Sequence, residues 1–453
     1  MSTEIVHAKV TGESMDMSDE VLVERLTAAI SGDVDASARR KAEYSTDASN
    51  YRIPPRVVVF PKKHDDVVAA LRISRELNVP LTSRGAGTSC AGNAVGPGMV
   101  LDFSRYMNAI VEIDPQARTA RVQPGVVMGD LQKAAAPFGL RFGPDPSTQN
   151  RATFGGMIGN NACGPRAVAY GRTADNVLAL RALLADGTEI STDDGVAAIG
   201  GLAELVSGNL KTIRTALGRF KRQVSGYSLE HLLPENGADL AKFLVGTEGT
   251  LAVVTEATLR LVPVASNPLL LVLGYADMAT AADDVPRLME FGPLAVEGID
   301  AQLVEVVRKA KGSVPELPAG GGWLFVELGA RDGEDSDAVR RRAEAMASAA
   351  ATDAYRMCEA GPDATELWRI RADGVGLAGN SPAGKAAWPG WEDSAVPPEK
   401  LGGYLRDLRA LMEGHGLDGL MYGHFGDGCV HLRIDFPIDD ASGTPIFREF
   451  MEQ

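Results

Sequence analysis

The stretch LTSRGAGTSCAGNAVGPGMV, residues 81–100, connects two short apolar segments through a loop rich in glycine and small polar side chains. Its five glycines permit backbone angles that turn successive N–H groups toward one point, and these are Gly85, Gly87, Gly92, Gly96 and Gly98. Hydroxyl and amide groups of Thr88, Ser89 and Asn93 add side-chain donors. The stretch therefore predicts a concave anion site suited to a phosphate group.

The segments around this loop predict strand, helix and strand in turn. Val57–Phe60 is β-branched and aromatic, and residues 64–78 carry apolar side chains on one helical face. The loop then continues into a further strand at residues 99–103, whereas a nicotinamide-dinucleotide fingerprint opens directly into a helix. No G-x-x-x-x-G-K-[ST] sequence occurs. A dinucleotide fold of the doubly wound type and a P-loop are both disfavoured.

The sequence PRVVVFP at residues 55–61, followed by RGAGTS at 84–89, resembles the FAD-binding domain of the vanillyl-alcohol oxidase/PCMH superfamily. Within it, the chain resembles the D-lactate and D-2-hydroxyglutarate dehydrogenase branch. The resemblance implies an α+β protein with a two-subdomain FAD-binding domain and an α+β cap, or substrate domain, built on an antiparallel sheet. We expect a leader and helix at residues 1–50, the FAD domain at 51–265 and the cap at 266–453.

Composition limits the classes of partner and compartment. A formal charge of −15 over 453 residues opposes generic binding to nucleic acid or to an anionic membrane surface. The four cysteines form no C-x-x-C, so zinc-ribbon and iron–sulfur ligand runs are absent from this sequence. The first thirty residues resemble no signal or transit peptide, and no window approaches eighteen consecutive apolar residues. We expect a cytoplasmic protein, with at most peripheral association at the inner membrane face.

Two further glycine-rich stretches complete the expected cofactor site. Residues 144–164, PDPSTQNRATFGGMIGNNACG, are so punctuated by proline and glycine that no regular helix or strand is expected to run through them. Such a segment can lie along an elongated cofactor, although a buried irregular loop is an equal reading of this stretch alone. Residues 245–261 predict a tight turn followed by a strand, and their glycines allow close approach of a ligand.

The family resemblance assigns cofactor contacts in all three stretches. The expected FAD-binding residues are Arg84, Gly85, Ala86, Gly87, Thr88, Ser89, Asn93, Pro146, Ser147, Thr148, Gly155, Gly156, Gly159, Asn160, Asn161, Gly164, Gly246, Glu248, Gly249 and Val253. No histidine lies between His64 and His231, so covalent attachment through a histidine in this region is excluded and FAD is expected to bind noncovalently.

The cap is expected to be an antiparallel sheet covered by helices on one face. Its most informative motif is YGHFGDGCVHLRI at residues 422–434, in which two histidines bracket a Gly-Asp-Gly turn. Their imidazoles can converge on zinc, manganese or iron, or can make structural hydrogen bonds. The motif resembles the G-H-x-G-D-G-N-x-H of D-2-hydroxy-acid dehydrogenases, which implies that His424 and His431 bind a divalent metal. Cys429 stands where that family often has asparagine.

The resemblance also implies two residues that bind the substrate carboxylate, and a full-length protein that is longer than this sequence. Arg371 occupies the place of the family's carboxylate-binding arginine and Lys385 that of a following lysine, although each alone reads as a surface side chain. The family completes its metal site with a glutamate in a downstream E-H-G motif, which this sequence does not contain. We therefore expect an N-terminal portion of a larger protein, similar to fused members that carry a cysteine-rich iron–sulfur region.

The implied reaction is oxidation of a D-2-hydroxy acid, D-2-hydroxyglutarate or D-lactate, to the 2-oxo acid, with His424, His431, Arg371 and Lys385 as catalytic residues. Electrons would pass to a quinone, an electron-transfer flavoprotein or an iron–sulfur region, and an oligomer is compatible with this role. Two alternatives remain at this point. One is a flavin oxidase of another alcohol, and the other is a flavin-loaded module that is inactive without its missing partner segment.

Overall fold

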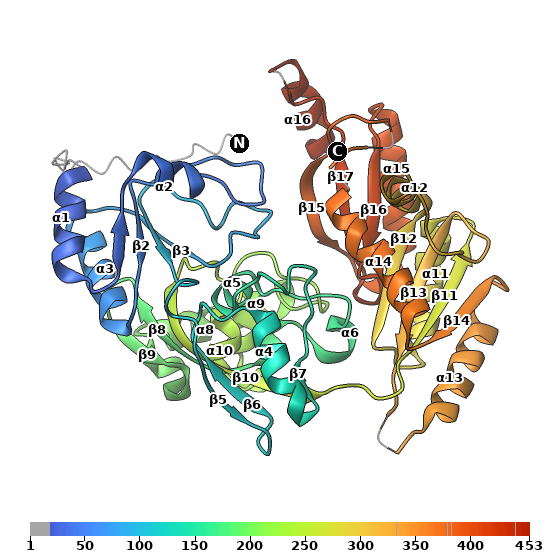
Figure 1. Ribbon diagram of the computed structural model, residues 1–453, viewed down its shortest axis with the longest axis horizontal. Helices are drawn as coiled ribbons and strands as arrows, with labels where there is room; N and C mark the ends of the chain where they lie inside the picture. The colour runs from blue at the N-terminus through green and yellow to red at the C-terminus, as the bar shows by residue number, and fades with distance from the viewer. Residues whose placement is uncertain (1–18, 332, 378, 382, 440) are drawn as a thin grey trace.

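A computed structural model describes residues 19–331, 333–377, 379–381, 383–439 and 441–453. The chain forms two domains joined by a short connection (Figure 1). We call residues 19–263 the N-terminal domain and residues 269–453 the C-terminal domain. No helix of the described residues is both long and apolar enough to cross a membrane.

The N-terminal domain begins with a small sheet of order β1-β2-β4-β3, in which β2, β3 and β4 are parallel and β1 is antiparallel to β2. All four residues of β2 are buried, as expected for a strand covered on both faces. Helices α1 and α3 pack on one face, while Tyr44 packs on the other. Its strands are β1 (Asp33–Asp35), β2 (Val57–Phe60), β3 (Leu81–Arg84) and β4 (Met99–Asp102).

A second, antiparallel sheet of order β5-β6-β10-β8-β9, with β7 paired to β10, forms the other half of this domain. Its strands are β5 (Ile110–Asp114), β6 (Thr119–Val122), β7 (Leu140–Phe142), β8 (Val177–Leu184), β9 (Glu189–Ser191) and β10 (Ala252–Pro263). The helices of the domain are α1 (Asp19–Ala29), α2 (Ala38–Glu43), α3 (His64–Glu76), α4 (Met128–Ala135), α5 (Phe154–Asn160), α6 (Ala167–Tyr170), α7 (Thr173–Asn176), α8 (Leu202–Gly208), α9 (Leu210–Ala216) and α10 (Leu240–Leu244).

Helix α5 corrects one expectation from the sequence, because it runs through the stretch in which no regular element was expected. Thr153 caps it by accepting a hydrogen bond from the N–H of Gly156, and Asn161 ends it in the left-handed conformation with φ of 51°. Phe154, Met157 and Ile158 are buried in the domain core. The helix is therefore held by its cap and by its apolar face, which together offset the low helix propensity of its glycines.

The C-terminal domain is built on an antiparallel sheet in which seven strands of the described chain pair in the order β14-β11-β13-β12-β16-β17-β15. Its strands are β11 (Leu269–Tyr275), β12 (Ala295–Asp300), β13 (Gly322–Leu328), β14 (Tyr355–Glu359), β15 (Trp388–Ala395), β16 (Gly419–Gly423) and β17 (Cys429–Ile434). Its helices are α11 (Met278–Met289), α12 (Ala301–Lys311), α13 (Ser336–Ala349), α14 (Pro362–Leu377), α15 (Leu401–Gly414) and α16 (Thr444–Glu452).

Helices cover both faces of this sheet, so the expectation of a single covered face was wrong. Leu271 and Leu273 of β11 pack with helices α11, α13 and α15, whereas Leu270 and Val272 of the same strand pack with α12 and α14. Every residue of β11, β12 and β13 is buried for this reason. A two-sided strand lacks the alternation of apolar and polar residues by which one covered face is recognised.

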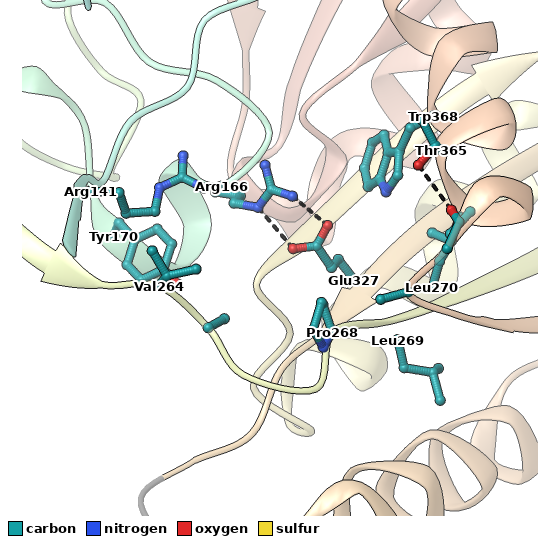
Figure 2. A pocket seen from close by; sticks show the side chains of 14 residues that line it. Arg141, Arg166, Tyr170, Val264, Pro268, Leu269, Leu270, Glu327, Thr365 and Trp368 are labelled. Carbon is teal, nitrogen blue, oxygen red and sulfur yellow. Dashed lines mark hydrogen bonds and ion pairs between the residues drawn. The ribbon is translucent and has the colours of Figure 1, made fainter. Parts of the chain in front are cut away.

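A partly buried ion pair joins the two domains (Figure 2). The Nε and Nη2 groups of Arg166, in the N-terminal domain, donate to the two carboxylate oxygens of Glu327 on β13 at 2.8 and 2.6 Å. Nη1 of Arg166 also donates to Asp145 at 2.5 Å. A cavity of about 230 Å³ beside the pair is lined from both domains, by Arg141 and Tyr170 on one side and by Trp368 on the other.

We predict that Glu327→Gln loosens this domain contact. The substitution keeps the shape of the side chain but removes one of the two carboxylates that pair with Arg166, so the free energy of unfolding should fall by roughly 2 kcal/mol. Urea unfolding measures the change, and proteolysis between residues 263 and 269 should accelerate. Glu235→Gln is the matched control, because its pair with Arg214 is half exposed on both sides and should contribute much less to stability. Equal losses in the two variants would contradict the prediction.

Candidate flavin and metal site

A cavity of about 810 Å³ lies between the two domains and brings the three glycine-rich stretches together. The loop after β3 contributes residues from Arg84 to Ala94, the segment around α5 contributes residues from Asp145 to Arg166, and the turn before β10 contributes residues from Gly246 to Gly249. Arg371, His424 and His431 line the same cavity from the C-terminal domain. The three predicted cofactor stretches therefore face the same space as Arg371, His424 and His431.

The cavity surface has the features that a flat, polar cofactor requires. A Cβ added at Gly159 would meet only the Cα of Glu248, at 3.8 Å, and one added at Gly249 would meet only the Cβ of Ser83, at 3.9 Å. Both glycines thus leave open space where a side chain would stand. The buried hydroxyl of Ser83, which also lines the cavity, has no hydrogen-bond partner in the described chain. An unsatisfied buried donor beside such a surface fits a bound polar group.

Of the residues predicted to contact FAD, all but Val253 line this cavity. Val253 is buried in the core between the two sheets of the N-terminal domain, and its neighbours Ala252 and Val254 line the cavity instead. The alternation of side chains along β10 explains this shift of one residue. Sequence similarity places a strand at the site, but the choice of face depends on how the strand packs.

Arg84 holds the phosphate loop in shape. Its guanidinium donates to the carbonyl oxygens of Ala94 and Thr46 at 3.0 Å each and lies 4.8 Å from the centre of the Tyr44 ring. A Cβ at Gly87 would come within 2.4 Å of this guanidinium, and Gly87 has a φ of 66°. The Arg84 guanidinium therefore fills the space beside Gly87 and connects the start of the loop to Ala94.

On the opposite wall, one carboxylate connects two of the predicted catalytic residues. Glu297 of β12 is 0 % exposed and accepts a hydrogen bond from Nε of Arg371 at 2.8 Å. Its other oxygen lies 2.7 Å from Nδ1 of His424. This contact assigns the His424 proton to Nδ1 and leaves the lone pair of Nε2 on the far side of the ring. Burial raises the pKa of Glu297, but His424 and Arg371 outweigh that effect and hold it below its ordinary value.

The sequence analysis did not single out Glu297, although a signal was present. Glu297 is the one charged residue in the run AVEGI of a strand whose residues are all buried. Charged side chains are rarely fully buried unless they are paired, so an acidic residue inside an apolar strand indicates a buried partner.

His424 and His431 converge as predicted, because their Nε2 atoms lie 3.2 Å apart. His424 follows β16, and His431 lies on β17, which pairs with β16. Nδ1 of His431 accepts a hydrogen bond from the backbone N–H of Asp393 at 3.3 Å. The hairpin thus directs both rings toward the cavity from one edge of the sheet.

Asp393 and Cys163 add two further ligand types to this centre. Ligand atoms of Cys163, Asp393 and His424 all lie within 4.8 Å of one another, and the three residues line the cavity. Burial raises the pKa of the Cys163 thiol to about 12. Burial also acts to raise the pKa of Asp393, but the imidazole of His431 and the Arg222 guanidinium lower it well below its usual range. The sequence analysis identified neither residue as a ligand.

Backbone geometry explains why Asp393 could not be recognised from sequence. It lies in β15 with a φ of 59°, within the shift between Trp391 and Ser394 in the register of β15 against β17. A residue other than glycine in the left-handed region is uncommon, and an irregular strand can redirect one side chain. No local sequence pattern here indicates that the strand is irregular.

Arg371 and Lys385 are placed differently by the structure. Arg371 lies on α14, is 6 % exposed, lines the cavity and stands 4.7 Å from the centre of the Tyr422 ring. Lys385 lies in an exposed turn, where its backbone carbonyl accepts a hydrogen bond from Ser381, and it is not among the residues that line the cavity. Of the two predicted carboxylate-binding cations, the structure thus brings only Arg371 to the cavity.

The fold and the cavity define a two-domain flavoprotein, and comparisons with known families identify its type. Residues 55–193 match the family described as FAD binding domain, and residues 266–453 match the family described as FAD linked oxidases, C-terminal domain. The match to an FAD-binding family confirms the expected FAD cofactor.

Similarity to proteins of known function identifies the branch of the family. D-lactate dehydrogenase of Archaeoglobus fulgidus is 33% identical over 83% of this chain and 74% of its own length. D-2-hydroxyglutarate dehydrogenases of Pseudomonas putida and Escherichia coli are 33% and 32% identical over 92% and 93% of this chain, but over only 45% of their own length. The chain belongs to the FAD-linked oxidases, in the branch of D-lactate and D-2-hydroxyglutarate dehydrogenases. It spans about half the length of the D-2-hydroxyglutarate dehydrogenases it matches.

The solved structure of p-cresol methylhydroxylase with substrate bound has the same fold. It superposes with a TM-score of 0.67 at 15% identity, over 96% of this chain and 86% of its own. The predicted α+β fold with a PCMH-type FAD-binding domain and a cap is therefore confirmed.

We predict that Glu297→Gln destabilises the C-terminal domain. A glutamine offers one acceptor oxygen and one donor amide, so it cannot accept from both His424 and Arg371. One buried donor loses its partner and Arg371 loses its counter-ion, at a combined cost of roughly 3 kcal/mol in urea unfolding. Glu305→Gln on α12 is the control, because the Glu305 side chain is only half-buried and pairs with Arg308. A loss no larger than that of the control would show that Glu297 is not the centre of a buried network.

We predict that Gly159→Leu prevents FAD binding and leaves the fold intact. A leucine at this position would extend into the cavity, and overpacking costs about 1–3 kcal/mol, which lowers FAD affinity tenfold or more. The flavin content of purified protein and its far-ultraviolet circular dichroism measure the two effects. Gly403→Leu on α15 is the control, since a Cβ there has no neighbour within 4 Å. Full flavin occupancy in the Gly159 variant would place the cofactor elsewhere.

Proposed function

We propose that this protein oxidises a D-2-hydroxy acid, D-2-hydroxyglutarate or D-lactate, to the corresponding 2-oxo acid. The observation that carries the proposal is the buried group Arg371–Glu297–His424, which faces the same cavity as the three flavin stretches. It offers a carboxylate-binding cation and an imidazole lone pair beside the place of the cofactor. The names of the relatives support a D-2-hydroxy acid as substrate.

Arg371 is proposed to bind the substrate carboxylate. Its Nε is engaged by Glu297, and no other hydrogen bond to its guanidinium is found in the described part of the chain. The two terminal nitrogens can therefore grip a carboxylate in the planar, bidentate manner of an arginine. Glu297 fixes the direction of this fork before the substrate arrives, so less conformational freedom is lost on binding. Lys385 is kept as a second cation for the substrate on the resemblance alone.

His424 and His431 are proposed to hold a divalent metal beside the substrate hydroxyl. The lone pair of His424 Nε2 is available because Glu297 holds the ring proton at Nδ1, and this is how a carboxylate orients a metal-binding histidine. A zinc, manganese or iron ion bound there would lower the pKa of a coordinated hydroxyl group. The adjacent ring of His431 provides a second neutral imidazole nitrogen, and imidazole is a ligand that these ions accept.

FAD, when bound, would accept the hydride from the substrate α-carbon. The protein's contribution is to orient the substrate through Arg371, to fix the imidazole of His424, and to enclose both between two domains. The same proposal includes onward transfer of electrons to a quinone, an electron-transfer flavoprotein or an iron–sulfur region.

Anaerobic reduction of the bound flavin tests the function. We expect D-2-hydroxyglutarate or D-lactate, but not the L-acid, to bleach the flavin band of the purified protein, and we expect added zinc or manganese to accelerate the bleaching. A flavin spectrum that no D-acid bleaches would overturn the proposal for this chain. Rapid peroxide formation in air with an unrelated alcohol, insensitive to chelators, would instead identify an oxidase.

An arginine variant tests the substrate contact in the same assay. Arg371→Lys keeps a cation beside Glu297 but loses the planar fork, so the half-saturating acid concentration should rise about tenfold or more. The FAD spectrum should stay unchanged. Arg308→Lys, on the exposed face of α12, should behave as wild type. An unaltered concentration dependence in the Arg371 variant would remove this residue from the substrate site.

A further inference from the structure

The centre around His424 draws ligands from both domains. Cys163 follows α5 in the N-terminal domain, whereas Asp393 and His424 belong to the C-terminal domain. The sulfur of Cys163 lies 3.9 Å from Oδ2 of Asp393, and the ligand atoms of all three residues lie within 4.8 Å of one another. Nitrogen, oxygen and sulfur ligands thus meet at the domain boundary.

The distance between the Nε2 atoms of the two imidazoles is close to that expected for two ligands of one metal ion. Bonds of about 2.0–2.1 Å in a tetrahedral site place two ligand nitrogens roughly 3.3 Å apart. The Nε2 atoms of His424 and His431 are 3.2 Å apart. Nδ1 of His431 accepts the N–H of Asp393, which places the ring proton of His431 on Nε2, toward Nε2 of His424. For His431 to bind an ion through Nε2, this proton must move to Nδ1, which lies 3.5 Å from Oδ1 of Asp393.

Charged groups beside Cys163 are compatible with a bound cation. The buried Arg222 donates to the Cys163 sulfur at 2.6 Å and lies within 3.7 Å of Asp427 and 3.9 Å of Asp393. Asp427 is buried, whereas the side chain of Asp393 is 39 % exposed. A Cys163 thiolate formed on metal binding would offset part of the charge that a divalent cation brings beside Arg222. Glu297 and Arg371 balance each other separately.

We propose that Cys163 and Asp393 complete a metal site with His424 and His431, so that one divalent ion bridges the N-terminal and C-terminal domains. This inference rests on the metal part of the proposed function and adds a thiolate and a carboxylate to its two histidines. On binding, the Cys163 S–H bond is replaced by a metal–sulfur bond, and the proton leaves to solvent. A mixed nitrogen, oxygen and sulfur set selects zinc over magnesium or calcium, which bind oxygen ligands.

The proposed ion would also connect the segment that lines the flavin cavity to the residues proposed to bind the substrate. Cys163 lies in the segment that lines the flavin cavity, and His424 is held by the carboxylate that orients Arg371. A bridging ion would therefore fix the flavin segment against the substrate-binding wall, and zinc should raise the thermal midpoint of the holoprotein.

X-ray absorption at the zinc edge of FAD-loaded protein holding one zinc ion tests the proposal. We expect one sulfur scatterer at about 2.3 Å among nitrogen and oxygen scatterers at about 2.0–2.2 Å. A wild-type spectrum without sulfur would overturn the proposal, whatever the behaviour of the variants. The measurement is independent of turnover, so a protein that reduces no D-acid can still support the site, and an active protein can still contradict it.

Cysteine variants identify the ligand. Cys163→Ser should lose the sulfur scatterer and lower zinc affinity about tenfold or more, whereas substitution of the buried β14 cysteine, Cys358→Ser, should match the wild type. Asp393→Asn should weaken zinc binding by a similar factor and retain the sulfur. Cys429 also contacts Asp393, at 3.4 Å. A sulfur signal that survives in the Cys163 variant and disappears in Cys429→Ser would overturn the assignment of Cys163.

Discussion

The site depends on a single buried carboxylate. Glu297 has no exposed surface, and its two oxygens bind the proton of His424 Nδ1 and Nε of Arg371. A carboxylate in such a position is costly unless it is fully paired, and here its two partners are the groups that face the cavity. Because Glu297 must be paired for its strand to be buried, it also fixes the orientation of the imidazole and the guanidinium that face the cavity.

The cavity itself is a product of domain docking. Its cofactor loops come from the N-terminal domain and its chemical groups from the C-terminal domain, so neither domain contains a site alone. The Arg166–Glu327 pair and the proposed Cys163–Asp393 bridge cross the same boundary. Glu327 and Glu297 lie on adjacent paired strands, β13 and β12, so the domain contact and the carboxylate behind the cavity wall belong to one sheet.

The glycines around α5 show how far sequence reasoning extends. These glycines line the cavity, because a missing side chain leaves the same space in a helix or a loop, and their contact with a cofactor stays a prediction. The sequence pattern failed to predict the helix, because glycine and proline lower local propensity while the cap at Thr153 and the buried Phe154 act through tertiary contacts. Likewise, the all-buried strands of the cap gave no alternation from which its second helical layer could be read.

The sequence by itself determined the fold class, the FAD cofactor and the pairing of His424 with His431, since these follow from local motifs whose spacing is short. Tertiary structure alone decided that Glu297 joins His424 to Arg371, that Ala252 and Val254 rather than Val253 line the cavity, and that Lys385 lies outside its lining. It also decided that Cys163 meets Asp393 across the domain boundary. Contacts between residues separated by more than a hundred positions depend on packing and strand register, and local sequence patterns do not encode those distances.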